Sequence, residues 1–123
     1  MVMNVNKDNF AELIQNNDIV VVDFWAPWCG PCKSFAPTFE AFAQAHKDEA
    51  IFAKVNTEEE EELAAHFQIR SIPTLMVFRE QVVVFMQPGV LPESALEQLL
   101  EQVKTLDMVQ VRREISEYQE GGR

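Results

Sequence analysis

The stretch VVDFWAPWCGPCKSFAP, residues 21–37, contains the only two cysteines of the chain. Its first half belongs to an apolar run, IVVVDFW at residues 19–25, which is rich in β-branched and aromatic side chains. Such a run is typical of a strand that is covered on both faces of a sheet. After the cysteines, Phe35, Phe39 and Phe42 recur at helical spacing. The stretch therefore predicts a central strand, then a turn that carries both cysteines, then an amphipathic helix that begins at them.

The segments around this stretch predict the rest of the fold. Their apolar spacing and end signals predict a helix near residues 10–14, strands at 51–56, 74–79 and 82–86, a helix opened by a capping box at Thr57 and Glu60, and a last helix after Pro92. The predicted order is helix, strand, helix, strand, helix, strand, strand, helix. Alternation followed by a hairpin implies an α/β fold, with a central mixed β-sheet flanked by helices on both faces.

Three local features refine this prediction. Pro37 lies inside the second helix, but the apolar stripe continues past it, so we expect a bend and not an end. The acidic run at residues 58–62 is explained by the favourable position of carboxylates in a first helical turn. The hairpin turn at Glu80 and Gln81 lacks the usual Asn-Gly or Asp-Gly signal.

Length, charge and hydropathy limit the classes of function. A chain of 123 residues fits one domain that folds without disulfides or metals. No apolar run approaches the ~18 residues of a membrane span. The N-terminal residues lack the basic start and apolar region of a secretory signal, so we expect a cytoplasmic protein. A formal charge of −10 disfavours nucleic acid and anionic membranes as partners and favours other proteins.

The pair Cys29-x-x-Cys32 could be a structural disulfide, half of a zinc site or a reactive pair. A structural disulfide is disfavoured in the cytosol, where the thiol pool keeps ordinary pairs reduced. A zinc site needs two further ligands, and the only histidines, His46 and His66, lack a metal-binding spacing. We therefore expect no metal site, and redox chemistry remains.

The predicted turn makes the two thiols inequivalent. Cys29 would lie at a helix N-terminus, where unpaired backbone amides favour the thiolate, whereas Cys32 would lie one turn further in and be more buried. Cys29 can then attack a disulfide of a partner protein, and Cys32 can resolve the mixed disulfide. Between them, Gly30 permits close approach of a substrate backbone, and Pro31 stiffens the ring.

Asp23 interrupts the apolar strand that leads to the cysteines. Burial would raise the pKa of this carboxyl group, and a buried acid close to Cys32 could accept its proton during resolution. An edge position or a satisfied polar contact explains the residue equally well. Both interpretations stay open on the residues alone.

Several motifs together resemble the thioredoxin family. VDFWAPWCGPCK, residues 22–33, is similar to the family's active-site segment almost residue for residue. SIPT, residues 71–74, resembles the family's cis-proline loop, with Pro73 at the expected distance from the cysteines. Lys54 falls where the family keeps a lysine beside a buried aspartate, and Gly89 falls on a loop that borders the active site.

This resemblance implies the thioredoxin fold and a set of site residues. For catalysis it implies Cys29 as the nucleophile, Cys32 as the resolving cysteine, Asp23 as the buried acid and base, Lys54 as the residue that tunes Asp23, and Pro73 as a cis-proline. For substrate binding it implies Trp28, Gly30, Pro31, Ile72 and Gly89. An extended substrate segment could pair with the backbone of Ile72, much as a strand is added to a sheet edge.

The implied function is a thiol–disulfide oxidoreductase that reduces protein disulfides through Cys29 and Cys32 and is recycled by an NADPH-dependent thioredoxin reductase. Because the electrons come from another protein, we expect a monomer with a redox-active Cys29–Cys32 disulfide and no bound cofactor. Two alternatives stay open. One is an oxidase or isomerase of the same fold, which usually carries histidine before the second cysteine, and the other is a binding module with incidental redox activity.

The end of the chain departs from the family. The resemblance covers roughly residues 4–106, which predicts a thioredoxin domain at 1–106 and a C-terminal extension at 107–123. In the extension, Val111, Ile115 and Tyr118 have the spacing of an amphipathic helix, which would pack on the domain or on a second copy. A frayed extension is the alternative.

The last predicted hairpin also departs from the family, whose members commonly carry Lys-Asn-Gly where this chain has Arg-Glu-Gln at residues 79–81. We therefore expect a looser or longer turn. Phe85, Met86 and Pro88 are unusual as well. Because they border the implied docking surface, they bear on the choice of partner more than on the chemistry.

Overall fold

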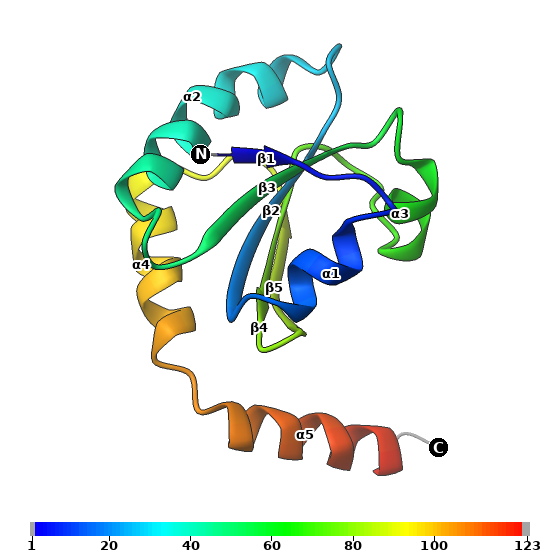
Figure 1. The fold of residues 1–123 in the computed structure, drawn as a ribbon, viewed down its shortest axis with the longest axis vertical. Coiled ribbons are helices and arrows are strands. Elements are labelled where there is room, and N and C mark those ends of the chain that lie inside the picture. The colour runs from blue at the N-terminus through cyan, green and yellow to red at the C-terminus, as the bar shows by residue number, and fades with distance from the viewer. Residues whose placement is uncertain (1, 122–123) are drawn as a thin grey trace.

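The computed structural model describes residues 2–121, which form one five-stranded sheet with helices on both faces (Figure 1). In order across the sheet, the strands are β1 (Val2–Asn4), β3 (Ile51–Asn56), β2 (Ile19–Trp25), β4 (Thr74–Arg79) and β5 (Val82–Pro88). The helices are α1 (Phe10–Gln15), α2 (Gly30–Ala45), α3 (Glu61–His66), α4 (Glu93–Lys104) and α5 (Met108–Gly121). β1 and β2 run parallel to β3, whereas β4 is antiparallel to β2 and β5 is antiparallel to β4. The predicted mixed sheet is confirmed, and β1 is a strand too short for the sequence pattern to reveal.

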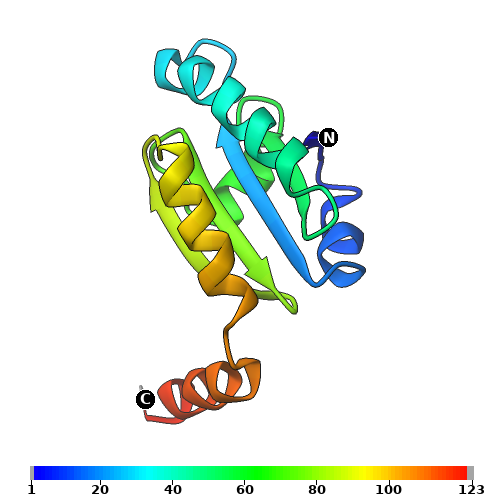
Figure 2. The same cartoon turned by 90° about the vertical axis from the view of Figure 1, so that its left-hand side faces the viewer.

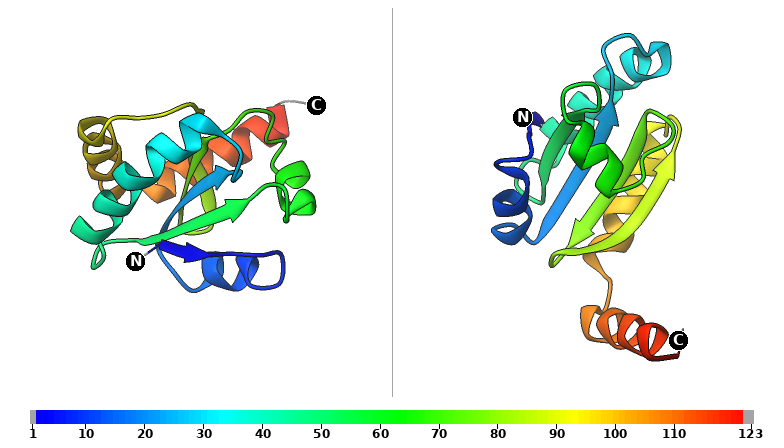
Figure 3. Two further views of the ribbon diagram at one scale, coloured as in Figure 1. Left: turned by 90° about the horizontal axis from the view of Figure 1, so that it is seen from above. Right: turned by 90° about the vertical axis from the view of Figure 1, so that its right-hand side faces the viewer.

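β2 is the centre of the fold and is buried at every position before Trp25, as its composition predicts. Val21 belongs to an apolar cluster with α2 and α4, which cover one face of the sheet (Figure 2). Val20 and Val22 belong to a second cluster, which includes side chains of α1 and partly buried residues of α3 on the opposite face (Figure 3, right). The alternation along β2 therefore distributes its side chains between two cores.

α2 packs through the predicted phenylalanines. Phe35, Phe39 and Phe42 are all buried, and the last two meet Phe52 of β3 edge-on, with ring centroids 6.0 and 5.3 Å apart. Edge-to-face contacts of this kind add to the stabilisation from apolar burial. The helix continues past Pro37 to its end at Ala45, so the proline does not terminate it, as predicted.

The two histidines lie at the ends of helices. The ring of His46, the C-cap of α2, contacts the carboxylates of Glu49 and Glu97, and Lys104 in turn contacts Glu49. Partial burial disfavours the charged ring, but the two carboxylates outweigh this effect and raise the pKa of His46. This cluster ties the end of α2 to α4. Within residues 2–121, no group of three or more histidines, cysteines and carboxylates is arranged to hold a metal ion.

The predicted capping box at Thr57 and Glu60 is wrong. α3 begins only at Glu61, its N-cap is Glu60, and no side chain caps it. The hydroxyl of Thr57 instead donates to the carbonyl of Trp25 at the end of β2. Only Glu61 and Glu62 of the acidic run therefore lie in a first helical turn, where the macrodipole favours a carboxylate.

The β4–β5 turn is tight, so the expectation of a looser or longer turn is also wrong. Arg79 pairs directly with Val82, which leaves a loop of Glu80 and Gln81 alone. Both residues have positive φ, 50° and 72°, as a two-residue hairpin turn of the I′ kind requires. The backbone thus adopts the common turn geometry without the glycine or asparagine that usually accompanies it.

The C-terminal extension forms the helix α5, which lies beyond the end of the sheet where β4 turns into β5 (Figure 1). Met108 is buried, and the guanidinium of Arg112 donates to the side chain and the backbone carbonyl of Glu80 at 2.7 and 2.9 Å. The frayed alternative is therefore wrong for the helix, while residues 122–123 lie outside the described part of the chain. In that part, no helix is both long and apolar enough to cross a membrane.

The left-handed turn generates a stability prediction. Gln81→Gly should raise the free energy of unfolding by about 1 kcal/mol, because glycine has no Cβ to make a positive φ costly. Denaturation in urea, monitored by circular dichroism, measures the change. Gln87→Gly, the same replacement within β5, is the matched control and should lower the free energy of unfolding. Equal destabilisation at both positions would contradict the left-handed conformation of Gln81.

Candidate active site

Cys29 and Cys32 lie where β2 leads into α2, and a disulfide joins them with their Cα atoms 5.2 Å apart. Cys29 is the N-cap of α2, and its Sγ accepts a hydrogen bond from the backbone N–H of Cys32 at 3.2 Å. The predicted position of Cys29 at the helix N-terminus is therefore confirmed. A backbone amide and the positive end of a helix macrodipole favour the thiolate form of a cysteine.

The two cysteines are buried to nearly the same extent, with 4% of Cys29 and 3% of Cys32 exposed. Cys32 is thus the more buried of the two, as expected, but only by one percentage point. Cys29 is covered because Ile72 and Trp25 pack against the small cluster that the disulfide forms with Ala26. The chemical difference between the thiols rests on the backbone amide at Cys29 and not on burial.

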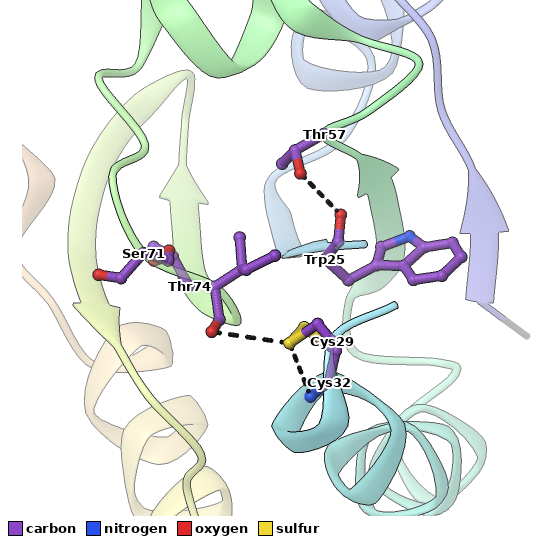
Figure 4. Close-up of a disulfide and its surroundings, with 7 residues drawn as sticks. Trp25, Cys29, Cys32, Thr57, Ser71 and Thr74 are labelled. Carbon is purple, nitrogen blue, oxygen red and sulfur yellow. Dashed lines mark hydrogen bonds between the residues drawn. A yellow bond between two sulfur atoms is a disulfide. The ribbon is translucent and has the colours of Figure 1, made fainter. Parts of the chain in front are cut away.

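The loop before β4 faces the disulfide (Figure 4). Its Ile72–Pro73 peptide bond is cis, as the resemblance implies, and the carbonyl oxygen of Ile72 lies 3.8 Å from the Sγ of Cys29. The N–H of Gly89 donates to the carbonyl of Pro73 at 2.8 Å. Gly89 has a φ of 101°, a backbone conformation that residues with a side chain rarely adopt. The fold thus brings together three segments that are far apart in the sequence.

Two threonines hold the backbone on either side of the cysteines (Figure 4). The carbonyl of Trp25 accepts hydrogen bonds from both the N–H and the hydroxyl of Thr57, at 2.8 and 3.0 Å. The buried hydroxyl of Thr74 donates to the carbonyl of Ser71 at 2.6 Å. Sequence analysis missed both roles, because a threonine hydroxyl next to a strand gives no sign of its partner.

Asp23 lies in the middle of β2, with 5% of its surface exposed. Because β2 is central, the edge position that the sequence left open is excluded. The structure shows no contact that satisfies Oδ1, which is buried and has no hydrogen-bond partner among residues 2–121. Burial raises the pKa of Asp23 to about 7, and the positive charge of Lys54 opposes the shift.

Lys54 is the residue of β3 directly opposite Asp23 in the sheet. Its ammonium nitrogen lies over the indole of Trp25, 5.1 Å from the ring centroid. The ring quadrupole attracts the charge there. Lys54 therefore acts on Asp23 through space while its ammonium group lies over a neutral partner, which fits the net upward shift of the Asp23 pKa.

Exposed apolar side chains come directly before the cysteines and directly after Gly89. Trp28, directly before Cys29, is the most exposed tryptophan, and Val90, directly after Gly89, is exposed as well. Ile72, in the cis-proline loop, is partly exposed. The predicted binding residues Gly30 and Pro31 are exposed at the start of α2. These exposed positions flank a cysteine pair that is itself almost fully buried.

The chain is similar to known thioredoxins over most of its length. The family model described as Thioredoxin matches residues 1–102. The "Putative thioredoxin 2" of Streptomyces coelicolor is 51% identical over 115 residues, which cover 94% of this chain and 85% of that protein. A thioredoxin of Alicyclobacillus acidocaldarius is 44% identical over 101 residues, covering 82% and 96%. The match to the Streptomyces protein is long enough to enter α5, where the family model has ended.

Solved structures give the same result. The thioredoxin of Plasmodium falciparum superposes with a TM-score of 0.76 at 36% identity, covering 82% of this chain and 98% of that one. Chloroplastic thioredoxin z superposes with a TM-score of 0.79 over 85% of this chain and 96% of that one, at 23% identity. The second likeness concerns the fold alone.

The buried carboxyl group generates a prediction on stability and pH. Since the folded-state pKa of Asp23 is raised from 3.8 to about 7, the folded state keeps a proton that the unfolded state releases, and stability falls as the pH rises between these values. Asp23→Asn removes this loss. At ~1.4 kcal/mol per pKa unit, we expect it to raise the free energy of unfolding by about 4 kcal/mol at pH 8 and by little at pH 3.5.

Urea denaturation of both proteins at the two pH values measures this difference. Asp48→Asn, at an exposed position after α2, is the matched control and should show no such pH dependence. A gain of equal size at pH 3.5 and pH 8 would contradict the assignment, since it would arise from packing and not from ionisation.

Proposed function

The chain belongs to the thioredoxin family, which reduces protein disulfides by dithiol–disulfide exchange, and we propose that Cys29 is its attacking nucleophile and Cys32 its resolving cysteine. The observation that carries this assignment is the position of Cys29 as the N-cap of α2, with its sulfur accepting a backbone N–H. A thiolate at that position is stabilised by the helix N-terminus and lies beside the cis-proline loop, 3.8 Å from the carbonyl oxygen of Ile72.

The first step forms a mixed disulfide between the protein and its substrate. The thiolate of Cys29 attacks one sulfur of the substrate disulfide, the substrate S–S bond breaks, and a mixed disulfide forms between Cys29 and the substrate. The other substrate sulfur leaves as a thiolate and takes up a proton from solvent. The amide of Cys32 lies 3.2 Å from the attacking sulfur, so it stabilises the negative charge before attack.

The second step releases the substrate. Asp23, as the carboxylate, accepts the proton of the Cys32 thiol, and the resulting thiolate attacks the sulfur of Cys29. The mixed disulfide breaks, the Cys29–Cys32 disulfide forms, and the second substrate sulfur leaves as a thiolate. Two electrons have then moved from the cysteine pair to the substrate. A carboxyl group with a pKa of about 7 can both hold and release a proton at neutral pH, which suits it to this transfer.

The remaining site residues bind the substrate through shape and backbone. An extended segment pairs with the backbone of Ile72 beside Pro73. Trp28 and Gly89 supply an apolar surface of low relief on either side. Gly30 and Pro31 keep the approach to Cys29 free of bulky or flexible side chains. Recognition through the main chain accepts many sequences, so a broad range of protein substrates is expected.

The electrons return from a second protein. We propose an NADPH-dependent thioredoxin reductase as the donor, with a monomer in the cytoplasm as the working form and no cofactor bound to this chain. The redox-active Cys29–Cys32 disulfide is then the only electron carrier of the domain. Disulfide-containing proteins are the substrates that membership of the family implies.

The assigned roles generate a trapping prediction. Cys32→Ser should accumulate a mixed disulfide between Cys29 and a protein substrate such as insulin, because the second step is blocked. Cys29→Ser should accumulate none, because the first step is blocked. NADPH consumption with a thioredoxin reductase, together with non-reducing electrophoresis, measures turnover and trapping. Turnover should fall to background in both variants.

Equal trapping by the two variants would contradict the division of roles. Full activity in the double variant, Cys29→Ser with Cys32→Ser, would show that the domain acts as a binding module. A reduction potential close to that of periplasmic oxidants would indicate a disulfide oxidase instead.

The proposed tuning of Asp23 generates a further prediction. Because the charge of Lys54 lowers the pKa of Asp23, Lys54→Met should move the rise of activity with pH to higher pH, by about one unit. Insulin reduction measured from pH 5 to pH 9 gives this midpoint. Lys47→Met, at an exposed position after α2, is the control. A lower rate with an unchanged midpoint would mean that Lys54 only packs against Trp25.

A further inference from the structure

β5 leaves one edge of the sheet open. It is the last strand in the order and pairs only with β4, so alternate N–H and C=O groups on its outer side have no strand partner among residues 2–121. An edge of this kind can add a further strand from another polypeptide. The loop that follows β5 carries Gly89 and leads directly to the cysteine site.

The side chains of β5 extend an apolar face beyond its helical cover. Val83 pairs with Phe78 and Met86 with Met76, two residues buried in the core that includes side chains of α1. β5 has no helix in front of it on this face (Figure 3, right), and Val83 and Met86 are accordingly 43% and 51% exposed. Large apolar side chains in a row on an exposed strand mark a surface for binding.

α5 closes the far end of this surface. A groove of about 580 Å³ separates it from β5 and is lined by Val83, Val84, Leu106, Val111, Ile115 and Tyr118, with Glu114 and Gln119. Tyr118 is 79% exposed although it lies on the apolar side of the helix. Because Arg112 bonds to Glu80 and Met108 is buried, the helix is held in place while its apolar side stays open.

The near end of the same surface is the redox site. Pro88 pairs with Thr74, the residue after the cis-proline, and the exposed Val90 follows Gly89. A strand of seven residues rises by about 3.3 Å per residue, so the distance from the cysteine site to α5 is roughly 20 Å. A polypeptide bound at Cys29 can therefore reach α5 with about ten extended residues.

We propose that the outer edge of β5 and its groove with α5 bind the segment that flanks the target disulfide in a substrate protein, as an added strand. This proposal rests on the proposed function, because the occupant is the same substrate that reacts with Cys29. The segment would be extended, with apolar side chains at alternate positions for Val83, Met86 and Tyr118. A basic residue at its far end would meet Glu114, the one charged side chain among residues 2–121 that lines the groove.

Charge favours such a segment over a second copy of the chain. The sequence carries a formal charge of −10, and two copies related by a two-fold axis across this face would bring their Glu114 carboxylates to the same interface. Like charges at a close interface oppose association. A substrate segment with a lysine or arginine gains from the same carboxylate.

Two synthetic peptides test the proposal. Each has an intramolecular disulfide followed by an arm of about ten residues that ends in two lysines, with valine and threonine alternating in one arm and glycine and serine in the other. Their reduction is measured by NADPH consumption with a thioredoxin reductase. For the intact protein, KM for the valine–threonine peptide should be about tenfold lower than for the glycine–serine peptide, with similar kcat.

Three variants locate the effect. Val83→Glu and Tyr118→Glu should each remove the tenfold difference in KM between the peptides, because a buried carboxylate would face the apolar arm. Val109→Glu places the same charge on α5 at an exposed apolar position that does not line the groove, so it should keep the difference. The glycine–serine peptide is the internal reference for every variant.

Equal KM values for the two peptides with the intact protein would overturn the proposal, and so would loss of the preference in Val109→Glu. A dimer in analytical ultracentrifugation that Tyr118→Glu dissociates would also overturn it, since a second copy would then cover the groove. If the intact protein reduced neither peptide, the failure would lie in the proposed function and not in this surface.

Discussion

The rest of the structure depends on the complete burial of β2. This strand lies between β3 and β4 and beneath helices on both faces, so nearly every side chain along it must be apolar. Asp23 is the exception, and its burial changes its acidity. Removal from water disfavours the charged form and raises the pKa of the carboxyl group to about 7. The same strand ends at the turn where Cys29 opens α2. The core and the redox site are therefore consequences of one arrangement.

The position of Lys54 determines how strongly its charge opposes the rise in the pKa of Asp23. An ammonium group bonded directly to Asp23 would stabilise the carboxylate and hold it ionised at neutral pH. The structure instead places the ammonium over the indole of Trp25, where the ring attracts it without neutralising it. The charge then lowers the pKa of Asp23 only in part, and the carboxyl group remains able to gain and lose a proton. Trp25 thus holds the ammonium group whose charge acts on Asp23.

Periodicity and residue type were sufficient to predict the parts of the fold that burial controls. The central position of β2, the phenylalanine face of α2 and the hairpin of β4 and β5 each follow from patterns of apolar residues. Sequence reasoning failed where local polar residues allow more than one arrangement. Thr57 bonds to Trp25 instead of capping α3, and Glu80 adopts a positive φ in a tight turn where a looser turn was expected. The burial of Cys29 was missed for a related reason, because Ile72 covers it from a distant loop.

The departures from the family at residues 79–81 and the C-terminal extension form a single structural unit. The guanidinium of Arg79 donates to the carbonyl of Val103 at 2.6 Å, at the end of α4. The next residue, Glu80, accepts the hydrogen bonds of Arg112 from α5. The usual Lys-Asn-Gly turn lacks the carboxylate that Arg112 contacts. Glu80 therefore has two roles: it is part of the left-handed two-residue turn, and it holds α5 through Arg112. The apolar side of α5 in turn borders the groove with β5.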